Sequence, residues 1–220
     1  MQADCTRAVA SECVRARLLL SARLCLCVRI SCVCVQMAAW KVGPSLAAGC
    51  TIIIKPSEFT PFSTLELAAA AEAIGLPKGV LQVVTGDGKV GNELITHKLT
   101  DKVTFTGSVP TGSKVMKAAA EGIKRVTLEL GGKSPAIVCE DANIDAALEW
   151  IVFGAFWNTG QICSATARVL LHESVAEEVT RRIVAAAHKL KQGTSFEDGV
   201  DIGPSCNKMQ WEKVQRYIEL

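Results

Sequence analysis

Aromatic residues are scarce in this chain of 220 residues, where Phe, Trp and Tyr together make up 5% and tyrosine occurs once. A surface that binds single-stranded nucleic acid combines aromatic rings, on which bases stack, with a strongly positive groove. The formal net charge is only +2. The sequence therefore argues against nucleic acid as a partner.

The sequence also lacks a long uninterrupted apolar run. The best candidate, Leu18–Val35, is broken by Arg23 and Arg29, whereas a membrane-spanning helix needs about 20 consecutive apolar residues. Histidine is equally scarce, with three in the chain. The paired N-terminal cysteines also lack the two-to-four residue spacing of zinc ligands. We therefore expect no membrane span, because the apolar run is broken, and no metal site, because suitable ligands are few.

Cysteine is abundant but unevenly placed, since six of the ten cysteines lie in the first 36 residues. The other four are widely spaced, which is typical of reduced thiols inside a cell and not of a disulfide framework. We expect a cytoplasmic protein, with a plastid or a peroxisome as the alternative. These four cysteines are Cys50, Cys139, Cys163 and Cys206.

Residues 1–36 differ in composition from the rest of the chain. They contain five arginines, two acidic residues and no lysine. An arginine-rich, acid-poor start resembles an organelle transit peptide. The alternative, which we favour, is a divergent and disordered or non-native extension that ends at Gln36, where the composition changes abruptly.

From Met37 onward, short β-branched runs alternate with helical patterns. Such alternation implies crossover connections and a parallel sheet covered by helices. We therefore predict an α/β fold, with a parallel, Rossmann-like coenzyme-binding sheet carrying helices on both faces, followed by the start of a second α/β domain. Ser63 and Asn143 are the expected N-caps of two helices. Expected strands are 51–54, 80–84, 103–106, 125–129, 135–139 and 168–172, and expected helices are 37–48, 63–74, 91–97, 113–120, 144–157, 175–191 and 210–220.

Two residues in the stretch Val126–Arg168 have the properties of a catalytic pair. Cys163 lies in the polar, small-residue segment Gly160-Gln161-Ile162-Cys163-Ser164, and Glu129 ends an apolar strand. A nucleophilic thiol must be stabilised as the thiolate, and a general base works best when partly desolvated. Cys163 is thus a candidate nucleophile and Glu129 a candidate base, although a buried structural thiol and a strand-end carboxylate are the simpler alternatives.

Two segments could bind a nucleotide. The turn from Thr106 to Gly112 joins a strand to a helix with glycine at both ends, which lets the backbone approach a phosphate at a helix N-terminus. Its spacing is GxxxxG and not the GxGxxG fingerprint, so a tight loop remains the alternative. Lys55 and Glu58 follow the end of a strand, where ligands of open parallel sheets bind, although an exposed loop pair has the same pattern.

The same motifs carry a resemblance. Leu-Glu-Leu-Gly-Gly-Lys-Ser-Pro at 128–135, with Phe-x-x-x-Gly-Gln-Ile-Cys-Ser at 156–164, resembles the aldehyde dehydrogenase superfamily. The wider match from Met37-Ala38-Ala39-Trp40-Lys41 onward is similar to the plant betaine aldehyde and aminoaldehyde dehydrogenases. It covers residues 37–220, less than half of a whole enzyme of that family. It implies a partial NAD-binding domain over 37–131 and the N-terminal part of a catalytic domain over 132–220.

The resemblance also implies roles for individual residues. Cys163 would attack the aldehyde, a hydride would pass to NAD, and Glu129 would activate the water that releases the acid. Trp40 and Trp157 would line a pocket for a small-molecule aldehyde that carries an ammonium group. Acidic Glu58 would repel a 2′-phosphate and so favours NAD over NADP. The implied cofactor contacts are Lys55, Glu58, Gly86, Gly91, Thr106, Gly107, Ser108, Thr111, Leu130 and Gly131.

Departures from the family pattern leave other functions open. The family's Asn-Tyr-Pro segment, whose Asn helps to hold the oxyanion, would fall at Cys32, Val33 and Cys34. The family's segments that position the nicotinamide ribose and form oligomers would follow Leu220. The resemblance implies that full-length relatives oligomerise, but the sequence predicts no oligomeric state for this chain. A catalytically inactive, truncated NAD-binding remnant is one alternative. A thiol hydrolase using Cys163 with His172 or His188 is another.

Overall fold

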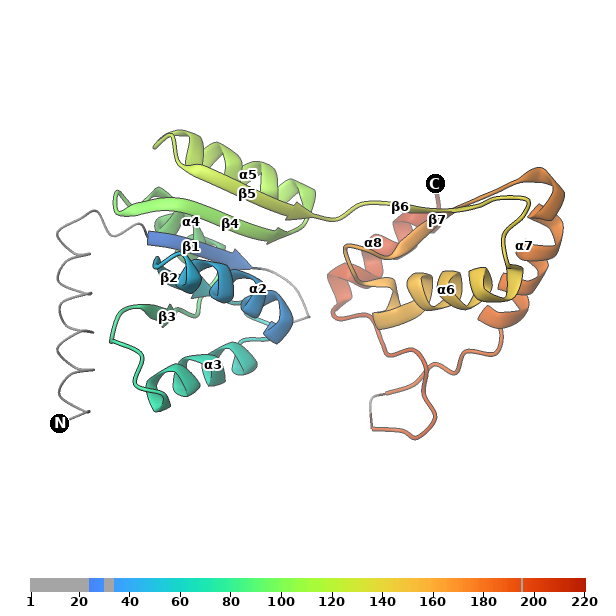
Figure 1. Cartoon of the computed structure of the whole chain (residues 1–220), viewed down its shortest axis with the longest axis horizontal. Coiled ribbons are helices and arrows are strands. Elements are labelled where there is room, and N and C mark those ends of the chain that lie inside the picture. The colour runs from blue at the N-terminus through green and yellow to red at the C-terminus, as the bar shows by residue number, and fades with distance from the viewer. Residues whose placement is uncertain (1–23, 30–33, 195) are drawn as a thin grey trace. The chain divides into compact units, whose positions relative to one another are not determined.

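The structure, a computed structural model, describes residues 24–29, 34–194 and 196–220. The chain divides into two compact units, one ending at Leu130 and the other beginning at Gly131 (Figure 1). Each unit has its own sheet.

The first unit is built on a five-stranded parallel sheet with the strand order β3-β2-β1-β4-β5 (Figure 1). This order places the first strand in the middle, with two strands added on either side. The strands are β1 (Leu24–Arg29), β2 (Thr51–Lys55), β3 (Leu81–Val83), β4 (Thr100–Gly107) and β5 (Arg125–Leu130).

Helices cover both faces of this sheet. On one face, Ile52 and Ile54 of β2 pack against α2 and are fully buried. On the other face, Phe105 of β4 packs against α4 and α5. Because side chains alternate between the two faces of a strand, each face has its own apolar core, which confirms the predicted α/β architecture. The helices are α2 (Cys34–Ala47), α3 (Phe62–Ala73), α4 (Gly88–Thr96) and α5 (Val109–Ala120).

The prediction that residues 1–36 lie outside the fold is wrong for part of that segment. Leu24–Arg29 form β1, which pairs with β2 on one side and β4 on the other. The run Leu-Cys-Leu-Cys-Val is apolar without interruption, as in central strands of parallel sheets. Helix α2 likewise begins at Cys34 and not at Met37. The transit-peptide interpretation and the register of Cys32 concern residues 1–23 and 30–33, outside the described residues.

The second unit contains a two-stranded parallel sheet, with α6 as the crossover between its strands (Figure 1). The predicted N-cap of α6 is confirmed, because Asn143 Oδ1 accepts a hydrogen bond from the backbone N–H of Ala146 at 3.1 Å. The elements are β6 (Ser134–Val138), α6 (Ile144–Phe156), the 3₁₀ turn η1 (Trp157–Gly160), β7 (Thr166–Leu171), α7 (Glu173–Ala187) and α8 (Lys208–Ile218).

Several helices begin earlier than the sequence pattern predicts. Helix α3 starts directly after Pro61 without a side-chain cap, so the predicted cap at Ser63 is wrong. Asp87 caps α4, and its carboxylate accepts the N–H of Lys89 at 2.9 Å. Ser108 caps α5. Asp87 and Ser108, which the sequence pattern assigns to turns, thus act as N-caps. Helices α4 and α5 therefore begin at Gly88 and Val109, three and four residues earlier than predicted.

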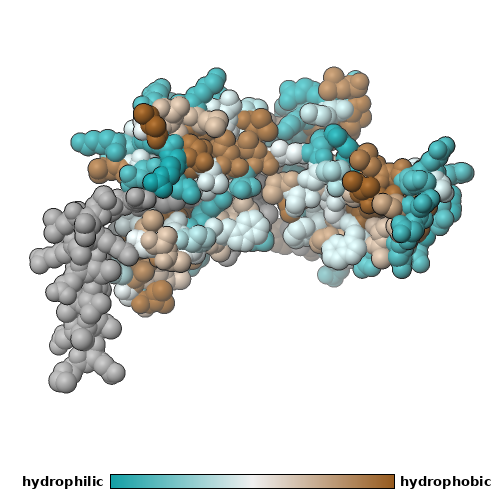
Figure 2. Space-filling model, turned by 45° about the horizontal axis from the view of Figure 1, so that its top comes forward, coloured by the Kyte–Doolittle hydropathy of each residue, from teal (hydrophilic) through white to brown (hydrophobic). Residues whose placement is uncertain are grey.

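Large apolar side chains remain exposed on both units (Figure 2), including Phe62 at 79%, Ile137 at 71% and Trp150 at 71%. Within the described ranges, no helix combines the length and the apolar character needed to cross a membrane.

Candidate functional site

The predicted nucleotide-binding residues of the first unit gather at one edge of its sheet. The order of connections reverses between β1 and β4, and ligands of open parallel sheets bind beyond the carboxyl ends of the strands at such a point. Lys55, Gly107 and Leu130 are the last residues of β2, β4 and β5. Since all these strands are parallel, the three lie along the same edge.

Lys55 is the most deeply buried charged residue of this edge, with 1% of its surface exposed. Its Nζ donates hydrogen bonds to the carbonyl oxygens of Pro56 at 3.0 Å and Gly86 at 2.6 Å. Burial lowers the pKa of Lys55, while nearby Glu58 and Asp87 oppose that shift. An ammonium group has three hydrogens, and among the described residues two of those of Lys55 have carbonyl acceptors, while Glu58 nearby is exposed.

The turn between β4 and α5 has a defined hydrogen-bond pattern. Ser108 Oγ accepts the N–H of Thr111 at 3.4 Å and lies 2.9 Å from Thr111 Oγ1. The buried hydroxyl of Thr106 has no hydrogen-bond partner among the described residues. Buried polar atoms are nearly always paired, so the hydroxyl of Thr106, near the end of β4, is a candidate contact for a polar ligand.

The glycines of this edge have packing reasons as well. A Cβ on Gly107 would lie 2.5 Å from Phe105 Cζ, and one on Gly112 would lie 2.6 Å from Leu130 Cδ2. Gly86 adopts a φ of +153° and leaves no room beside Val90. Gly91 is buried in the first turns of α4. At Gly86, Gly107 and Gly112, close packing against neighbouring side chains therefore favours glycine, whether or not a phosphate is bound.

Glu129 lies on β5 directly opposite Thr106 of β4. Its side chain is exposed, and so is Gly131, the first residue of the second unit. The partial burial that we expected for Glu129 is therefore not present in this structure.

Cys163 lies on a loop of unusual backbone shape. It follows three successive residues in the left-handed conformation, Asn158 (φ 53°), Thr159 (φ 59°) and Gly160 (φ 66°). Only glycine adopts this conformation freely, and other residues lose roughly 1–2 kcal/mol each. The thiol of Cys163 is free and exposed. Backbone strain of this kind persists only where the surrounding structure holds it, and it is common at functional sites.

Hydrogen bonds hold this loop. Asn158 Nδ2 donates to the carbonyl oxygen of Gln161 at 3.1 Å. Thr159 Oγ1 donates to the carbonyl oxygen of Gly203 at 3.1 Å. The Oε1 atom of Gln161 accepts the backbone N–H of Cys206 at 3.0 Å. The sequence pattern at 157–160 gave no sign of the last two contacts, because they join residues 44 and 45 positions apart.

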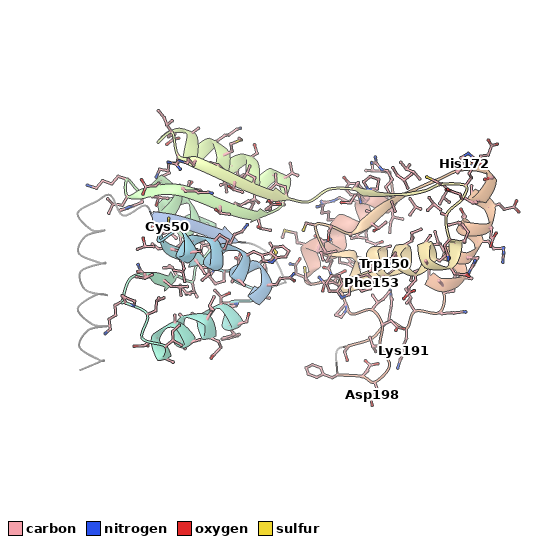
Figure 3. The ribbon with its side chains drawn as sticks, in the orientation of Figure 1. Cys50, Trp150, Phe153, His172, Lys191 and Asp198 are labelled. Atoms are coloured by element: carbon pink, nitrogen blue, oxygen red, sulfur yellow. The ribbon has the colours of Figure 1, made fainter. Side chains whose placement is uncertain are left out.

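An aromatic row runs along α6 toward the same loop. The ring centroids of Trp150 and Phe153 are 6.1 Å apart with perpendicular planes, and those of Phe153 and Trp157 are 5.2 Å apart and stacked (Figure 3). With Ile162 and Ser164, which flank Cys163, these rings line a groove of about 380 Å³. Trp150 was not predicted as a site residue, although the spacing of positions 150, 153 and 157 places these three aromatic residues on one helix face.

Trp40 is not part of this row. It lies on α2 in the first unit, with 57% of its surface exposed. The predicted pair of Trp40 and Trp157 is thus divided between the two units.

His172 and Cys163 are separated by the length of strand β7. It caps α7 (Figure 3), where Nδ1 lies 2.8 Å from Ser174 Oγ and Nε2 lies 4.0 Å from Glu140. Cys163 precedes β7 and His172 follows it, and a six-residue strand spans about 20 Å. This geometry argues against His172 as the base of a thiol hydrolase. Among the described residues, no group of His, Cys, Asp and Glu side chains could hold a metal ion.

Residues 33–220 match the aldehyde dehydrogenase family. The chain belongs to this family. It is 52% identical over 183 residues to the chloroplastic betaine aldehyde dehydrogenase of Amaranthus hypochondriacus, with 83% of this chain and 36% of that protein covered. It is 51% identical over 183 residues to the peroxisomal aminoaldehyde dehydrogenase 2 of Pisum sativum, with the same coverage.

Solved structures of the aldehyde dehydrogenase family share this fold. The betaine aldehyde dehydrogenase of Staphylococcus aureus in complex with NAD+ has a TM-score of 0.86 and 32% identity, and the match covers 90% of this chain and 40% of that one. The NAD+ complex of an aldehyde dehydrogenase from Bacillus cereus has a TM-score of 0.87 and 41% identity, covering 90% and 41%. The chain thus spans well under half the length of these relatives.

Proposed function

We propose that this chain is the coenzyme-binding and nucleophile-bearing part of an NAD-dependent aldehyde dehydrogenase that oxidises an aldehyde to a carboxylic acid. The observation that carries the proposal is the exposed thiol of Cys163 on a strained turn. Its flanking residues line the groove that also contains the aromatic row. Membership of the family supports the same activity.

The carboxyl edge of the first unit fits NAD. Lys55 and Glu58 would hold the adenine ribose. The hydroxyl of Thr106, which has no partner among the described residues, and the N-terminus of α5 at Ser108 would hold the pyrophosphate, because helix N-termini favour anions. Leu130 and Gly131 would contact the nicotinamide through their backbone. The exposed carboxylate of Glu58 would repel a 2′-phosphate, which favours NAD over NADP.

The chemistry follows from two side chains. The sulfur of Cys163 adds to the aldehyde carbon, and the backbone N–H of Cys163 stabilises the resulting oxyanion. NAD, when bound, supplies the acceptor for the hydride that leaves this carbon. Glu129 then takes a proton from water, the water oxygen attacks the thioester carbon, and the acid leaves as the thiol of Cys163 is restored. Covalent catalysis of this kind divides one difficult step into two.

The aromatic row favours an aldehyde that carries a cationic group. A quaternary or primary ammonium is attracted to the faces of Trp and Phe rings, most strongly to Trp. Phe153 and Trp157 present stacked rings at the groove beside Cys163. We therefore propose betaine aldehyde or an aminoaldehyde as the substrate, which also agrees with the printed names of the relatives.

The relatives' names place them in chloroplasts or peroxisomes. We propose a plastid or a peroxisome for this protein and not the cytoplasm. We also propose, from the family resemblance, that the protein assembles with further copies of itself.

Three variants test the function. Cys163→Ala should abolish NADH formation from betaine aldehyde, and Glu129→Gln should abolish acid release. Cys206→Ser, which alters another exposed thiol, should change neither. Full turnover by Cys163→Ala would remove the nucleophile assignment, and full acid release by Glu129→Gln would favour a thiol hydrolase.

An NAD-binding protein without catalytic turnover is the second candidate function, because Glu129 is exposed and not partly buried as a general base would be. It predicts that NAD raises the melting temperature, since binding to the folded state stabilises it, while NADH never forms. No thermal shift at saturating NAD would remove the cofactor proposal for both candidates.

A further inference from the structure

The loop that carries Cys163 cannot keep its shape by local interactions alone. Asn158 and Thr159 both occupy the left-handed region, and a β-branched residue such as Thr159 is rarely found there. An isolated loop would relax to the ordinary conformation. Contacts from elsewhere in the fold must therefore hold these residues in place.

Two side chains of this loop reach the same distant segment. The hydroxyl of Thr159 donates to the carbonyl oxygen of Gly203, and the Oε1 atom of Gln161 accepts the N–H of Cys206. The two contacts lie on either side of Gly160, so the loop is attached at two points to residues 203–206. Gln161 is the attachment nearer to Cys163, two residues away along the chain.

We propose that Gln161 is the positioning residue of Cys163, and that it acts by accepting the backbone N–H of Cys206. This inference rests on the proposed role of Cys163 as the nucleophile. Gln161 as a whole residue is half-buried, and its hydrogen bond to Cys206, 3.0 Å long, lies at the surface. Without it, the hydrogen bond of Thr159 to Gly203 would be the remaining one from the left-handed turn to residues 203–206 among the described residues. Residues 161–164 would then move more easily with their thiol.

Backbone hydrogen–deuterium exchange of the full 220-residue chain tests the attachment. In Gln161→Leu, which keeps the size but removes the acceptor, exchange should be about fivefold faster at residues 158–165 and 203–206, because about one net hydrogen bond is lost. Gln161→Glu keeps an acceptor oxygen and should restore the exchange rate. Exchange in α7 should not change in either variant.

Gln82→Leu is the matched control. The Nε2 atom of Gln82 also bonds a backbone group, the carbonyl oxygen of Gly79 at 3.2 Å, but in the first unit. It should leave exchange at 158–165 unchanged. Unaltered exchange in Gln161→Leu would overturn the proposal, because it would show that the hydrogen bond does not hold the loop. An equal increase of exchange throughout the second unit would also overturn it, because Gln161 would then support the whole unit and not this loop.

Acylation of Cys163 by p-nitrophenyl acetate, followed by the mass of the peptide that contains it, links the attachment to chemistry. Gln161→Leu should acylate about fivefold more slowly than the wild type, with Cys139 as the internal reference. If the wild type does not acylate at Cys163 but exchange responds as expected, the nucleophile assignment fails and the positioning of the loop stands. Normal acylation and normal exchange in Gln161→Leu would refute the positioning role alone.

Discussion

The ammonium nitrogen of Lys55 lies 2.6 Å from the carbonyl oxygen of Gly86, across 31 residues of the chain. This contact ties the end of β2 to the turn that precedes α4. Two residues that the sequence assigned separately to cofactor binding are thus parts of one arrangement, and the lysine that would meet the ligand also supports the edge on which the ligand would lie.

Replacing Lys55 by Met should destabilise the first unit by about 1–3 kcal/mol, because one buried and one partly buried carbonyl oxygen lose their donor. Urea unfolding at pH 7 measures this change. Lys78→Met, at an exposed position, is the control and should stay within about 0.5 kcal/mol of the wild type. Equal unfolding midpoints for the wild type and Lys55→Met would show that the contact contributes nothing.

The same lysine should give the stability a distinct pH dependence. In the folded chain, burial lowers the pKa of Lys55 below 10.5, its ordinary value. Between the folded pKa and 10.5, the unfolded chain binds more protons, so the contribution of Lys55 to the free energy of unfolding rises with pH in that interval. The stability difference between wild type and Lys55→Met should therefore grow in favour of the wild type as the pH rises toward 10.5. A difference that falls over this range would contradict the direction of the pKa shift.

Gly112→Ala should destabilise the first unit by about 1–3 kcal/mol, the usual cost of overpacking. The added Cβ would lie 2.6 Å from Leu130 Cδ2, at the end of β5. Gly88→Ala is the control, since nothing lies within 4 Å of its added Cβ, and it should stabilise by about 0.4–1 kcal/mol. Thermal unfolding of both variants decides, and stabilisation by Gly112→Ala would show that α5 can shift away from β5.

Trp157→Ala should raise the KM for a trimethylammonium aldehyde by about 2–30-fold, which corresponds to about 0.5–2 kcal/mol of cation–π attraction. A neutral aldehyde of similar size should be affected less. Trp211→Ala, which removes an exposed indole on α8, serves as the control. If both aldehydes lose affinity equally, Trp157 contributes packing and not recognition of the charge.

The class of fold could be predicted because short β-branched runs alternate with helical patterns in the sequence from Met37 onward. The middle strand was missed because the composition of residues 1–36, with five arginines and six cysteines, concealed the apolar run Leu-Cys-Leu-Cys-Val at 24–28. Pairing on both sides defines β1, and such pairing depends on residues far along the chain. Local periodicity alone could not show it.

The candidate site was predictable only as a set of separate residues. Motifs named Cys163 and Lys55, but the three left-handed residues before Cys163 and the reach of Gln161 to Cys206 depend on tertiary contacts. The exposure of Glu129 was likewise beyond the sequence, because the apolar neighbours on its strand suggested burial. Helix starts were missed for a local reason, since Asp87 and Ser108 served as caps where a turn was expected.

The left-handed turn before Cys163 has a consequence for chemical synthesis. D-amino acids favour the positive φ that costs L-residues free energy. D-alanine in place of Gly160, whose φ is 66°, would keep the backbone as it is and narrow the conformations of the unfolded chain. A semisynthetic protein with this mirror-image residue would display its reactive sulfur on a stiffer support than ribosomal synthesis can provide.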